Sequence, residues 1–333
     1  MATIQTRVAI CENLGNRPIF LNVVEVGLHA LAEVKIRPVV EDLPKTPLVG
    51  KYNKIDLLID NTSGYFKKKN TLRGQQYFLD HFNIKQDIAP AHLKSDTFFK
   101  YYKKKLDLKL DNFRRKKNYL FEDNNPIKNS KRISNLMDFK KINLHNNIFL
   151  KGNFENENYF HSYRDDLIEL FTVKPQYIKN NSTFIDMLLN TNSISIHIRQ
   201  NRFSDQNIKK NNHDNILKSK KFVDDTMEYI ERSIKFFNSK IEDPTFFIWS
   251  NDFTDLNSLF NKYKKNNLHF IVGNDVINDF NLFKYAKHFI VGPSTFHWWG
   301  AWLNNSPNKI CLIPKNINPS NNDNFWPQNW LKI

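Results

Sequence analysis

The side chain in this sequence best suited to neutralise a departing phosphate is Arg199, in the segment His197-Ile198-Arg199. A guanidinium stays charged, and its planar fork fits phosphate oxygens. In a strand, His197 and Arg199 point to one face and Ile198 to the other. The same residues would also suit a structural role, with Arg199 paired to a carboxylate and His197 satisfied by the backbone. The segment is therefore consistent with an anion-binding strand end or with an ordinary buried one.

A second candidate anion site is Gly292-Pro293-Ser294-Thr295, which follows an apolar run and precedes a helical pattern. Amides at a helix start have no acceptor inside the helix, and the helix dipole adds a partial positive charge there. Ordinary N-capping by Ser294 would use the same residues. Both interpretations stay open at this point.

Two carboxylates lie next to the ends of expected strands or helices, where ribose hydroxyls or a base edge are commonly bound. Asp252 comes after the apolar run 245–250, and Asp279 lies near the start of a helical pattern. Helix N-capping is the alternative for each. No Asp-x-Asp pair or histidine cluster with ligand spacing follows an expected strand, so we expect a site without metal.

Residues 296–303 combine aromatic side chains with a helical period. One face carries Phe296, Trp299, Trp302 and Leu303. We expect this face to pack in a core. His297 and Trp298 lie off it, and we expect them to face a cleft.

Alternating strands and helices must position these residues. Strands are expected at 193–199, 245–250, 268–272, 288–292 and 309–313, and helices at 223–241, 254–265, 276–287 and 294–304. In the first helix the apolar residues recur at steps of 4 and 3. Strands separated by helices predict a parallel sheet covered on both faces, which is a Rossmann-like domain. Its ligands should bind at the carboxyl ends of the strands.

The chain of 333 residues is long enough for two domains, which we place at 1–170 and 171–333. Residues 1–50 are atypical, with a single aromatic residue and four prolines. Within the first domain we expect a helix at 23–34 and strands at 34–40 and 55–59.

The formal net charge is +15. This charge fits nucleic acid, an anionic membrane surface or an anionic small substrate, and a coding bias toward Lys and Asn would produce it without any partner. A nucleic-acid platform would interleave basic and aromatic residues. Here the lysine runs lie apart from the tryptophans. Two distant cysteines and no long apolar run predict a cytoplasmic protein without a membrane span.

The segment STFHWWGAWL at 294–303 resembles the STFSWWGAWL motif of the alpha-1,2-fucosyltransferases, glycosyltransferase family 11, with His297 in place of a serine. Four further segments are similar to family motifs and follow the same order: residues 151–160, 197–199, 247–252 and 279–283. Together with a family-like stretch at 71–82, the resemblance covers about residues 70–333.

This resemblance implies an α/β fold of the GT-B kind, with two Rossmann-like domains facing a cleft. It implies inverting, metal-independent transfer of L-fucose from GDP-fucose to the 2-hydroxyl of a galactose in a surface glycan such as O-antigen, on an acceptor that can be lipid-linked. Peripheral contact with the inner membrane face would then fit the positive charge. The implied donor-binding residues are Asn16, Arg199, Asp252, Asp279, Ser294, Thr295 and Phe296.

The sequence departs from the family pattern in two places. Its H-x-R-R-G-D motif is HIRQNR here, so Arg202 occupies the position of the aspartate and Asp205 is the next carboxylate. Only Leu14-Gly15-Asn16 remains of an amino-terminal GGLGNQ. Candidates for the catalytic base are Asp205, His197 and Asp186. A catalytically silent or altered-donor homologue that binds a GDP-sugar is the alternative function.

Overall fold

The computed structural model describes residues 79–84, 156–203, 213–320 and 323–333, positions 91, 97 and 99, and the backbone of the amino-terminal strands given below. The carboxyl half contains a parallel sheet of six strands in the order β11-β10-β9-β12-β13-β14. The strands are β9 Asn192–Ile198, β10 Pro244–Ser250, β11 Asn267–Phe270, β12 His288–Ile290, β13 Cys311–Ile313 and β14 Leu331–Lys332. The α/β fold class is confirmed.

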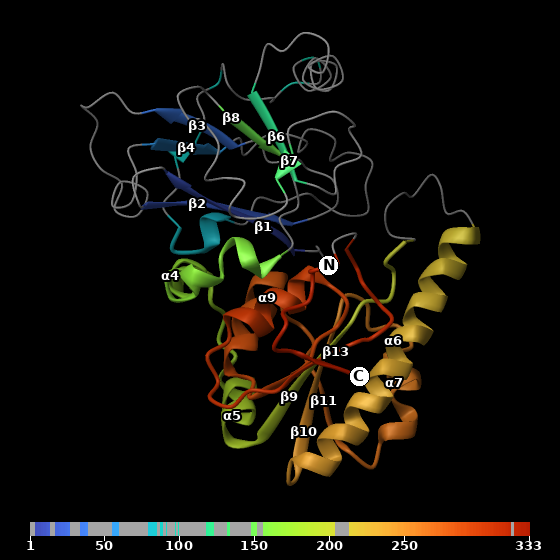
Figure 1. The fold of residues 1–333 in the computed structure, drawn as a ribbon. Coiled ribbons are helices and arrows are strands. Elements are labelled where there is room, and N and C mark those ends of the chain that lie inside the picture. The colour runs from blue at the N-terminus through green and yellow to red at the C-terminus, as the bar shows by residue number, and fades with distance from the viewer. Residues whose placement is uncertain are drawn as a thin grey trace.

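Helices cover both faces of this sheet (Figure 1). The helices of this half are α4 Arg164–Leu170, α5 Ser182–Asn190, α6 His213–Lys240, α7 Leu256–Leu259, α8 Val276–Leu282 and α9 Thr295–Leu303. Of these, α4 packs against α9. In the described part of this half, 3-10 helices lie at Glu157–Tyr159, His161–Tyr163, Pro175–Tyr177, Asn261–Tyr263 and Phe283–Tyr285. Another lies at Leu79–His81.

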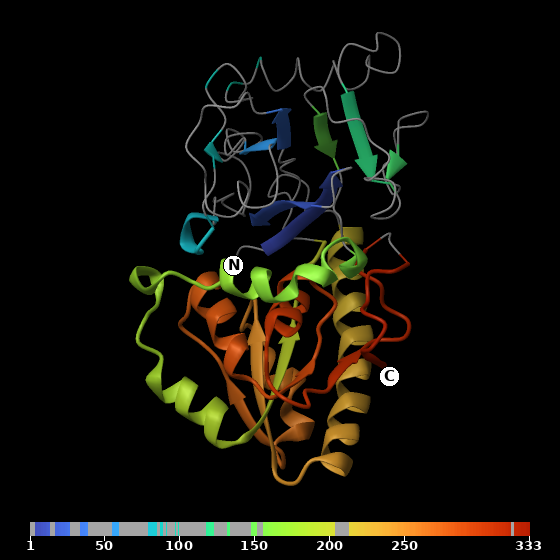
Figure 2. The same ribbon diagram turned by 60° about the vertical axis from the view of Figure 1, so that its left-hand side comes forward.

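Strand β9 shows how the two faces are divided. Ile194, Ile196 and Ile198 are fully buried in the cluster that includes the apolar stripe of α6. The alternate residues face α9, since Ser195 Oγ lies 2.8 Å from His297 Nε2. Figure 2 shows the long helix α6 running along one side of the sheet. The period-2 alternation therefore places the polar residues of β9 beneath α9.

The expected helices of this half are present, with differences in length. The stripe from Val223 to Phe237 is buried on α6, as the spacing predicts. The helix expected at 254–265 is shorter, because α7 ends at Leu259 and a 3-10 turn follows. Strand β14 has no counterpart in the sequence prediction, since it is two residues long.

Helix α9 is held firmly at its carboxyl end. Lys309 Nζ donates to the carbonyls of Ala301 (2.6 Å) and Asn304 (2.5 Å), and Arg164 Nη2 donates to those of Trp302 and Asn304, each at 2.8 Å. Cations there satisfy carbonyls that lack intrahelical donors and complement the helix dipole. These bonds fix the position of α9. The amino end of the same helix lies at the candidate site.

Residues before the expected domain boundary pack into the same core as those after it. Leu79, Phe82 and Ile84 are buried with Leu167 and Phe171 in the cluster under α8 and α9. Phe82 also forms an isolated bridge with Val173. The boundary at 170/171 stays a prediction.

The amino-terminal half contains an antiparallel pair, β1 Ile4–Asn13 and β2 Arg17–Val26, and a sheet in the order β5-β4-β3-β8-β6-β7. Its strands are β3 Val34–Pro38, β4 Ile55–Ile59, β5 Asp87–Ile88, β6 Asn118–Glu122, β7 Arg132–Ile133 and β8 Ile148–Lys151. Strand β3 is antiparallel to β4 and β8, so this sheet is mixed.

Both expected amino-terminal strands are confirmed, although the first ends at Pro38, and the expected helix at 23–34 is wrong for its described part. Val23 pairs with Arg7 in the β1–β2 ladder. An apolar run of this length suits either structure, and the pairing partner decides between them.

Candidate functional site

The strand order contains a reversal between β9 and β12. From β9 the chain moves outward through β10 to β11 and then returns to the other side of β9 for β12, β13 and β14. In open parallel sheets such a reversal leaves a crevice at the carboxyl ends of the two strands, where ligands bind. Arg199 follows β9 and Gly292 to Thr295 follow β12, so the fold brings the two predicted anion sites together.

The turn after β12 lies directly against β9. A Cβ on Gly292 would be 2.1 Å from the carbonyl oxygen of His197, so no side chain fits there. Ser294 is the N-cap of α9, and its Oγ accepts from His297 N at 3.3 Å. The capping interpretation of Ser294 is thus observed. It does not compete with anion binding by the first helical amides, at Thr295 and Phe296, whose acceptors must lie outside the helix.

His197 lies inside this junction rather than on its surface. It is 6% exposed, its Nδ1 is 3.4 Å from Ser294 Oγ, and its ring is 5.6 Å from that of Phe296. Burial lowers the pKa of His197 to about 4, so the imidazole is neutral at pH 7.

Arg199 is 8% exposed, and the residues after it connect β9 to the end of β10. The amide of Gln200 donates to Asn251 Oδ1 (2.8 Å), and its Nε2 donates to the carbonyl of Asp252 (2.5 Å). Neither Gln200 nor Asn251 was among the residues expected to matter. Two sequence signals could have found them: each directly follows a predicted strand, and each lies in a segment that was compared with a family motif.

The Asp252 carboxylate is held by protein donors. Its Oδ1 accepts from the amide of Thr254 (2.9 Å) and its Oδ2 from Asn201 Nδ2 (2.7 Å). Burial alone would raise the pKa of Asp252, but these hydrogen bonds outweigh it and the pKa lies below its usual value. Asp252 is therefore ionised and orders the loops after β9 and β10.

Arg202, at the family's aspartate position, has a defined role in the structure. Its Nη1 donates to the carbonyl of Pro293 (3.0 Å) and its Nη2 to that of Pro319 (2.8 Å). The guanidinium also lies 4.9 Å from the ring centre of Phe222. Arg202 thus connects the turn before α9 to the segment after β13.

Asp279 lies in the first turn of α8 and is not its N-cap, because Asp275 caps that helix. It is 2% exposed, and its Oδ1 has no hydrogen-bond partner among the described residues. Burial raises the pKa of Asp279 to about 7, an effect that the Asn274 side chain only partly offsets. Asn274 Nδ2 is likewise buried without a partner in the described structure. Because Asn274 lowers the pKa of Asp279, the two side chains lie close together, and either a ligand or a small rotation that pairs them with each other would satisfy both.

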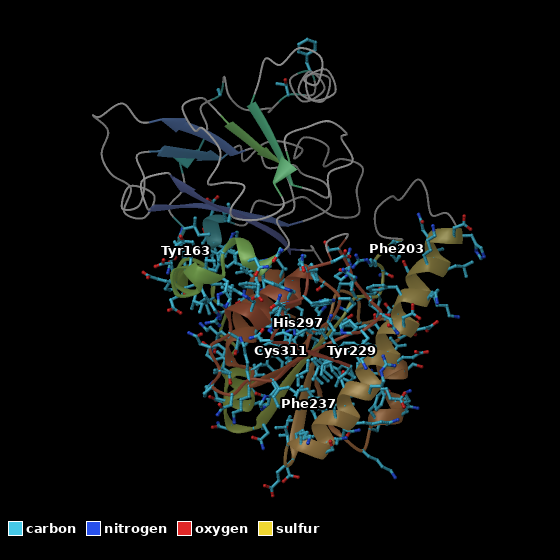
Figure 3. The ribbon with its side chains drawn as sticks, viewed as in Figure 1. Tyr163, Phe203, Tyr229, Phe237, His297 and Cys311 are labelled. Atoms are coloured by element: carbon cyan, nitrogen blue, oxygen red, sulfur yellow. The ribbon has the colours of Figure 1, made fainter. Side chains whose placement is uncertain are left out.

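The expectation that His297 and Trp298 face a cleft is wrong. His297 is fully buried against the sheet (Figure 3), and Trp298 is 4% exposed and donates from Nε1 to the carbonyl of Phe325 (3.0 Å). Helix α9 is covered by the sheet on one side and by the carboxyl-terminal segment on another. The ring of Phe296 also belongs to the core, 5.1 Å from that of Phe283, so only the Phe296 amide suits donor binding.

The remaining predicted residues are Asp205, Asn16 and Asp186. Asp205 and Asn16 are outside the described residues. Asp186 is exposed on α5, which leads into the amino end of β9, so it lies at the wrong end of the sheet for a base near Arg199. In the described part of the chain no group of three or more His, Cys, Asp or Glu is placed to hold a metal ion. Within the same residues, no helix has the length and apolar character needed to cross a membrane.

A pocket of about 500 Å³ lies away from this junction, between α6 and the carboxyl-terminal residues. Its lining mixes acidic side chains, Asp225 and Glu228, with basic ones, Arg232, Lys315 and Lys332. None of the predicted site residues lines it.

Comparison with known protein families gives a match. The sequence profile of "Glycosyl transferase family 11" matches residues 42–333. The chain belongs to this family. The match begins upstream of the segment near residue 70 where the motif resemblance starts.

Two proteins of Escherichia coli are similar to part of this sequence. An alpha-1,2-colitosyltransferase of Escherichia coli is 28% identical over 212 residues, which cover 61% of this chain and 69% of that protein. The O-antigen biosynthesis glycosyltransferase WbnK of Escherichia coli is 23% identical over 58% of this chain and 63% of its own length, which is less than two thirds.

Among solved structures, the chain is similar to POFUT1 in complex with GDP-fucose. The identity is 16% and the TM-score is 0.30, over 44% of this chain and 48% of that chain.

Proposed function

We propose that this family 11 chain transfers L-fucose from GDP-fucose to the 2-hydroxyl of a galactose residue, with inversion at the anomeric carbon. The observation that carries the proposal is the position of Arg199 and the start of α9 on the two strands that flank the sheet reversal. A fixed guanidinium and helix amides at that point suit a diphosphate.

The proposed chemistry is a single displacement. The galactose oxygen attacks the anomeric carbon, its proton passes to a base, and the bond from that carbon to the diphosphate oxygen breaks. The negative charge that develops on GDP is stabilised by Arg199 and by the amides of Thr295 and Phe296. Asp205 is our candidate for the base, and His197 ranks second because burial lowers its pKa to about 4 and makes its imidazole a weak base.

Asp279 and Asn274 support the assignment of guanine as the base of the donor. A carboxylate can accept from the N1–H and N2–H groups of guanine, and an amide nitrogen can donate to O6. These are the donor and acceptor types that the two side chains leave without partners in the described structure. Uracil and cytosine have no pair of adjacent donors like N1–H and N2–H of guanine.

Colitose is the alternative donor sugar, because a relative is named an alpha-1,2-colitosyltransferase. Colitose is fucose without its 3-hydroxyl group, so a site for either sugar would share the nucleotide contacts described above. A silent homologue that binds but does not transfer is the other alternative.

The name of WbnK supports a surface glycan such as O-antigen as the acceptor. We propose a galactose-terminated oligosaccharide, lipid-linked in the cell, and a peripheral contact of the basic chain with an anionic membrane.

Thermal shift with GDP, GDP-fucose, GDP-mannose, UDP and CMP tests the nucleotide first. A nucleotide at a hundred times its dissociation constant should stabilise the chain by about 2.7 kcal/mol. The shift should survive EDTA, because Arg199 and helix amides rather than a metal supply the positive charge. Stabilisation by UDP instead of GDP, or loss of the GDP shift on chelation, would contradict the proposal.

Turnover is tested by incubating the chain with GDP-fucose or GDP-colitose and a β-galactoside, and by following GDP release. NMR of the product should show an α-linkage to the galactose 2-oxygen. Release of GDP without a glycoside product would mean hydrolysis, and binding without either would identify a silent homologue.

A further inference from the structure

The turn Gly292–Ser294, which precedes the amides proposed to bind the diphosphate, is hydrogen-bonded to the imidazole of His297. His297 Nδ1 accepts a hydrogen bond from the amide of Gly292 at 3.0 Å, and its Nε2 lies 2.8 Å from Ser195 Oγ. The ring extends from α9 and is fully buried between this helix and strand β9. It therefore connects the central strand β9 to the turn after β12.

These contacts determine the tautomer. Because the Gly292 amide can only donate, Nδ1 must be unprotonated, and the ring proton must lie on Nε2, from which it is donated to Ser195 Oγ. Burial, with a smaller effect of His197, lowers the pKa of His297 well below its usual value, so the ring stays neutral. A neutral ring with one acceptor and one donor is what the two partners require.

The same turn is held at three further atoms. Ser294 N donates to the carbonyl of Gly292 (2.7 Å), Ser294 Oγ caps His297 N, and the carbonyl of Pro293 accepts from Arg202. Gly292 itself cannot move toward β9, because the carbonyl of His197 occupies that space. The Gly292 amide is thus the atom whose direction depends on His297.

We propose that His297 is a positioning residue for donor binding: its Nδ1 sets the direction of the Gly292 peptide, and through it the direction of the first amides of α9. This inference rests on the proposed function, since it assumes that those amides bind the diphosphate of GDP. It adds a specific task for the one position where STFHWWGAWL departs from the family motif.

Two near-isosteric variants separate the two ring nitrogens. In His297→Asn the amide oxygen takes the place of Nδ1 and can still accept from Gly292. In His297→Gln the terminal amide takes the place of Nε2, so the bond to Ser195 is kept and the acceptor for Gly292 is lost. The readout is the ratio of affinities for GDP and for guanosine, which has the base and ribose without phosphate.

His297→Gln should lower GDP affinity by about 10²-fold, because a displaced amide no longer meets the phosphate, and should leave guanosine affinity unchanged. His297→Asn keeps the acceptor for Gly292 but loses the contact with Ser195, so its ratio should change less than that of His297→Gln. If both variants keep the wild-type ratio, or if both lose affinity for guanosine as much as for GDP, His297 only fills the core and the inference is wrong.

Two serine variants on strand β9 test the same contact if the histidine variants fail to fold. Ser195→Ala removes the acceptor of Nε2 and should lower GDP affinity without changing guanosine affinity. Ser193→Ala removes an equally buried hydroxyl at the other end of β9, where it contacts Leu188 and Lys287, and should change neither affinity. Equal effects of the two alanine variants would overturn the inference.

The outcome for the wild-type chain keeps the two claims apart. If it binds GDP and His297→Gln binds GDP equally well, the inference alone fails. If it binds no guanine nucleotide, the proposed function fails and the inference fails with it.

Discussion

The guanidinium of Arg202 donates from Nη1 to the carbonyl oxygen of Pro293 at 3.0 Å, across 91 positions of sequence. This bond joins the segment after β9 to the turn before α9, and a second bond to Pro319 extends the connection. The residue that departs from the family's aspartate is therefore part of the framework of the candidate site.

Arg202→Asp, although it restores the family pattern, should lower stability and donor affinity. It removes two charge-assisted hydrogen bonds and places a carboxylate beside two carbonyl oxygens, at a cost of roughly 2 kcal/mol for a half-buried group. Urea denaturation measures the loss. Arg202→Lys keeps the charge but cannot reach both carbonyl oxygens, so its free energy of unfolding should lie between those of the wild-type chain and Arg202→Asp. A more active Arg202→Asp chain would contradict this role.

Gly292→Ala should abolish GDP binding or folding. Its Cβ would lie 2.1 Å from a backbone oxygen that cannot move without distorting β9. The matched variant is Gly273→Ala, which has φ +85° and no atom within 4 Å of the added Cβ. That change should cost only about 1–2 kcal/mol of backbone strain. The comparison is made by circular dichroism and calorimetry, and equal behaviour of the two variants would argue against the close approach.

Asp279 should make stability depend on pH. Its pKa is about 7 in the folded chain and 3.8 in the reference state, so between those values the folded state binds more protons than the unfolded state. The free energy of unfolding should therefore fall by a few kcal/mol as pH rises from about 4 to about 7 and level off above. Asp279→Asn should flatten this slope in urea titrations at several pH values.

GDP affinity should show the opposite trend, rising through about pH 7, if ionised Asp279 accepts from guanine. This trend should disappear in Asp279→Asn, as measured by calorimetry. A pH-independent GDP affinity in the wild-type chain would remove Asp279 from the donor site.

Arg199→Lys should lower transfer by about a hundredfold or more with the fold intact, because lysine keeps the charge but loses the two-pronged contact with the diphosphate. Initial rates of GDP release report the effect, and the melting temperature serves as the control for folding. Turnover near the wild-type rate would mean that Arg199 serves only the structure.

Asp205→Asn should lower turnover by roughly 10²-fold or more if Asp205 takes the acceptor proton, since the amide is nearly isosteric and cannot act as a base. GDP affinity should stay unchanged, which separates a base from a donor contact. An unaffected rate would show that Asp205 is not the base.

The local pattern was sufficient for most of the carboxyl half. Alternation at 193–199 and the stripe from Val223 to Phe237 predicted β9 and α6, because strand and helix periods are set by neighbours along the chain. Family motifs then indicated which strand ends form the candidate site. The same local reasoning was wrong at Val23, where the structure has a strand, because the choice depends on the pairing partner.

Tertiary structure alone decided what those residues touch. A helical period separates His297 and Trp298 from the apolar face of α9, but it cannot show that the sheet and the segment at Phe325 cover them. Ser195 and His297 are 102 positions apart, and they meet because the strand order reverses at β9 and places β12 beside it. Contacts of that kind depend on how strands are ordered in space, and no periodicity within a single element records that order.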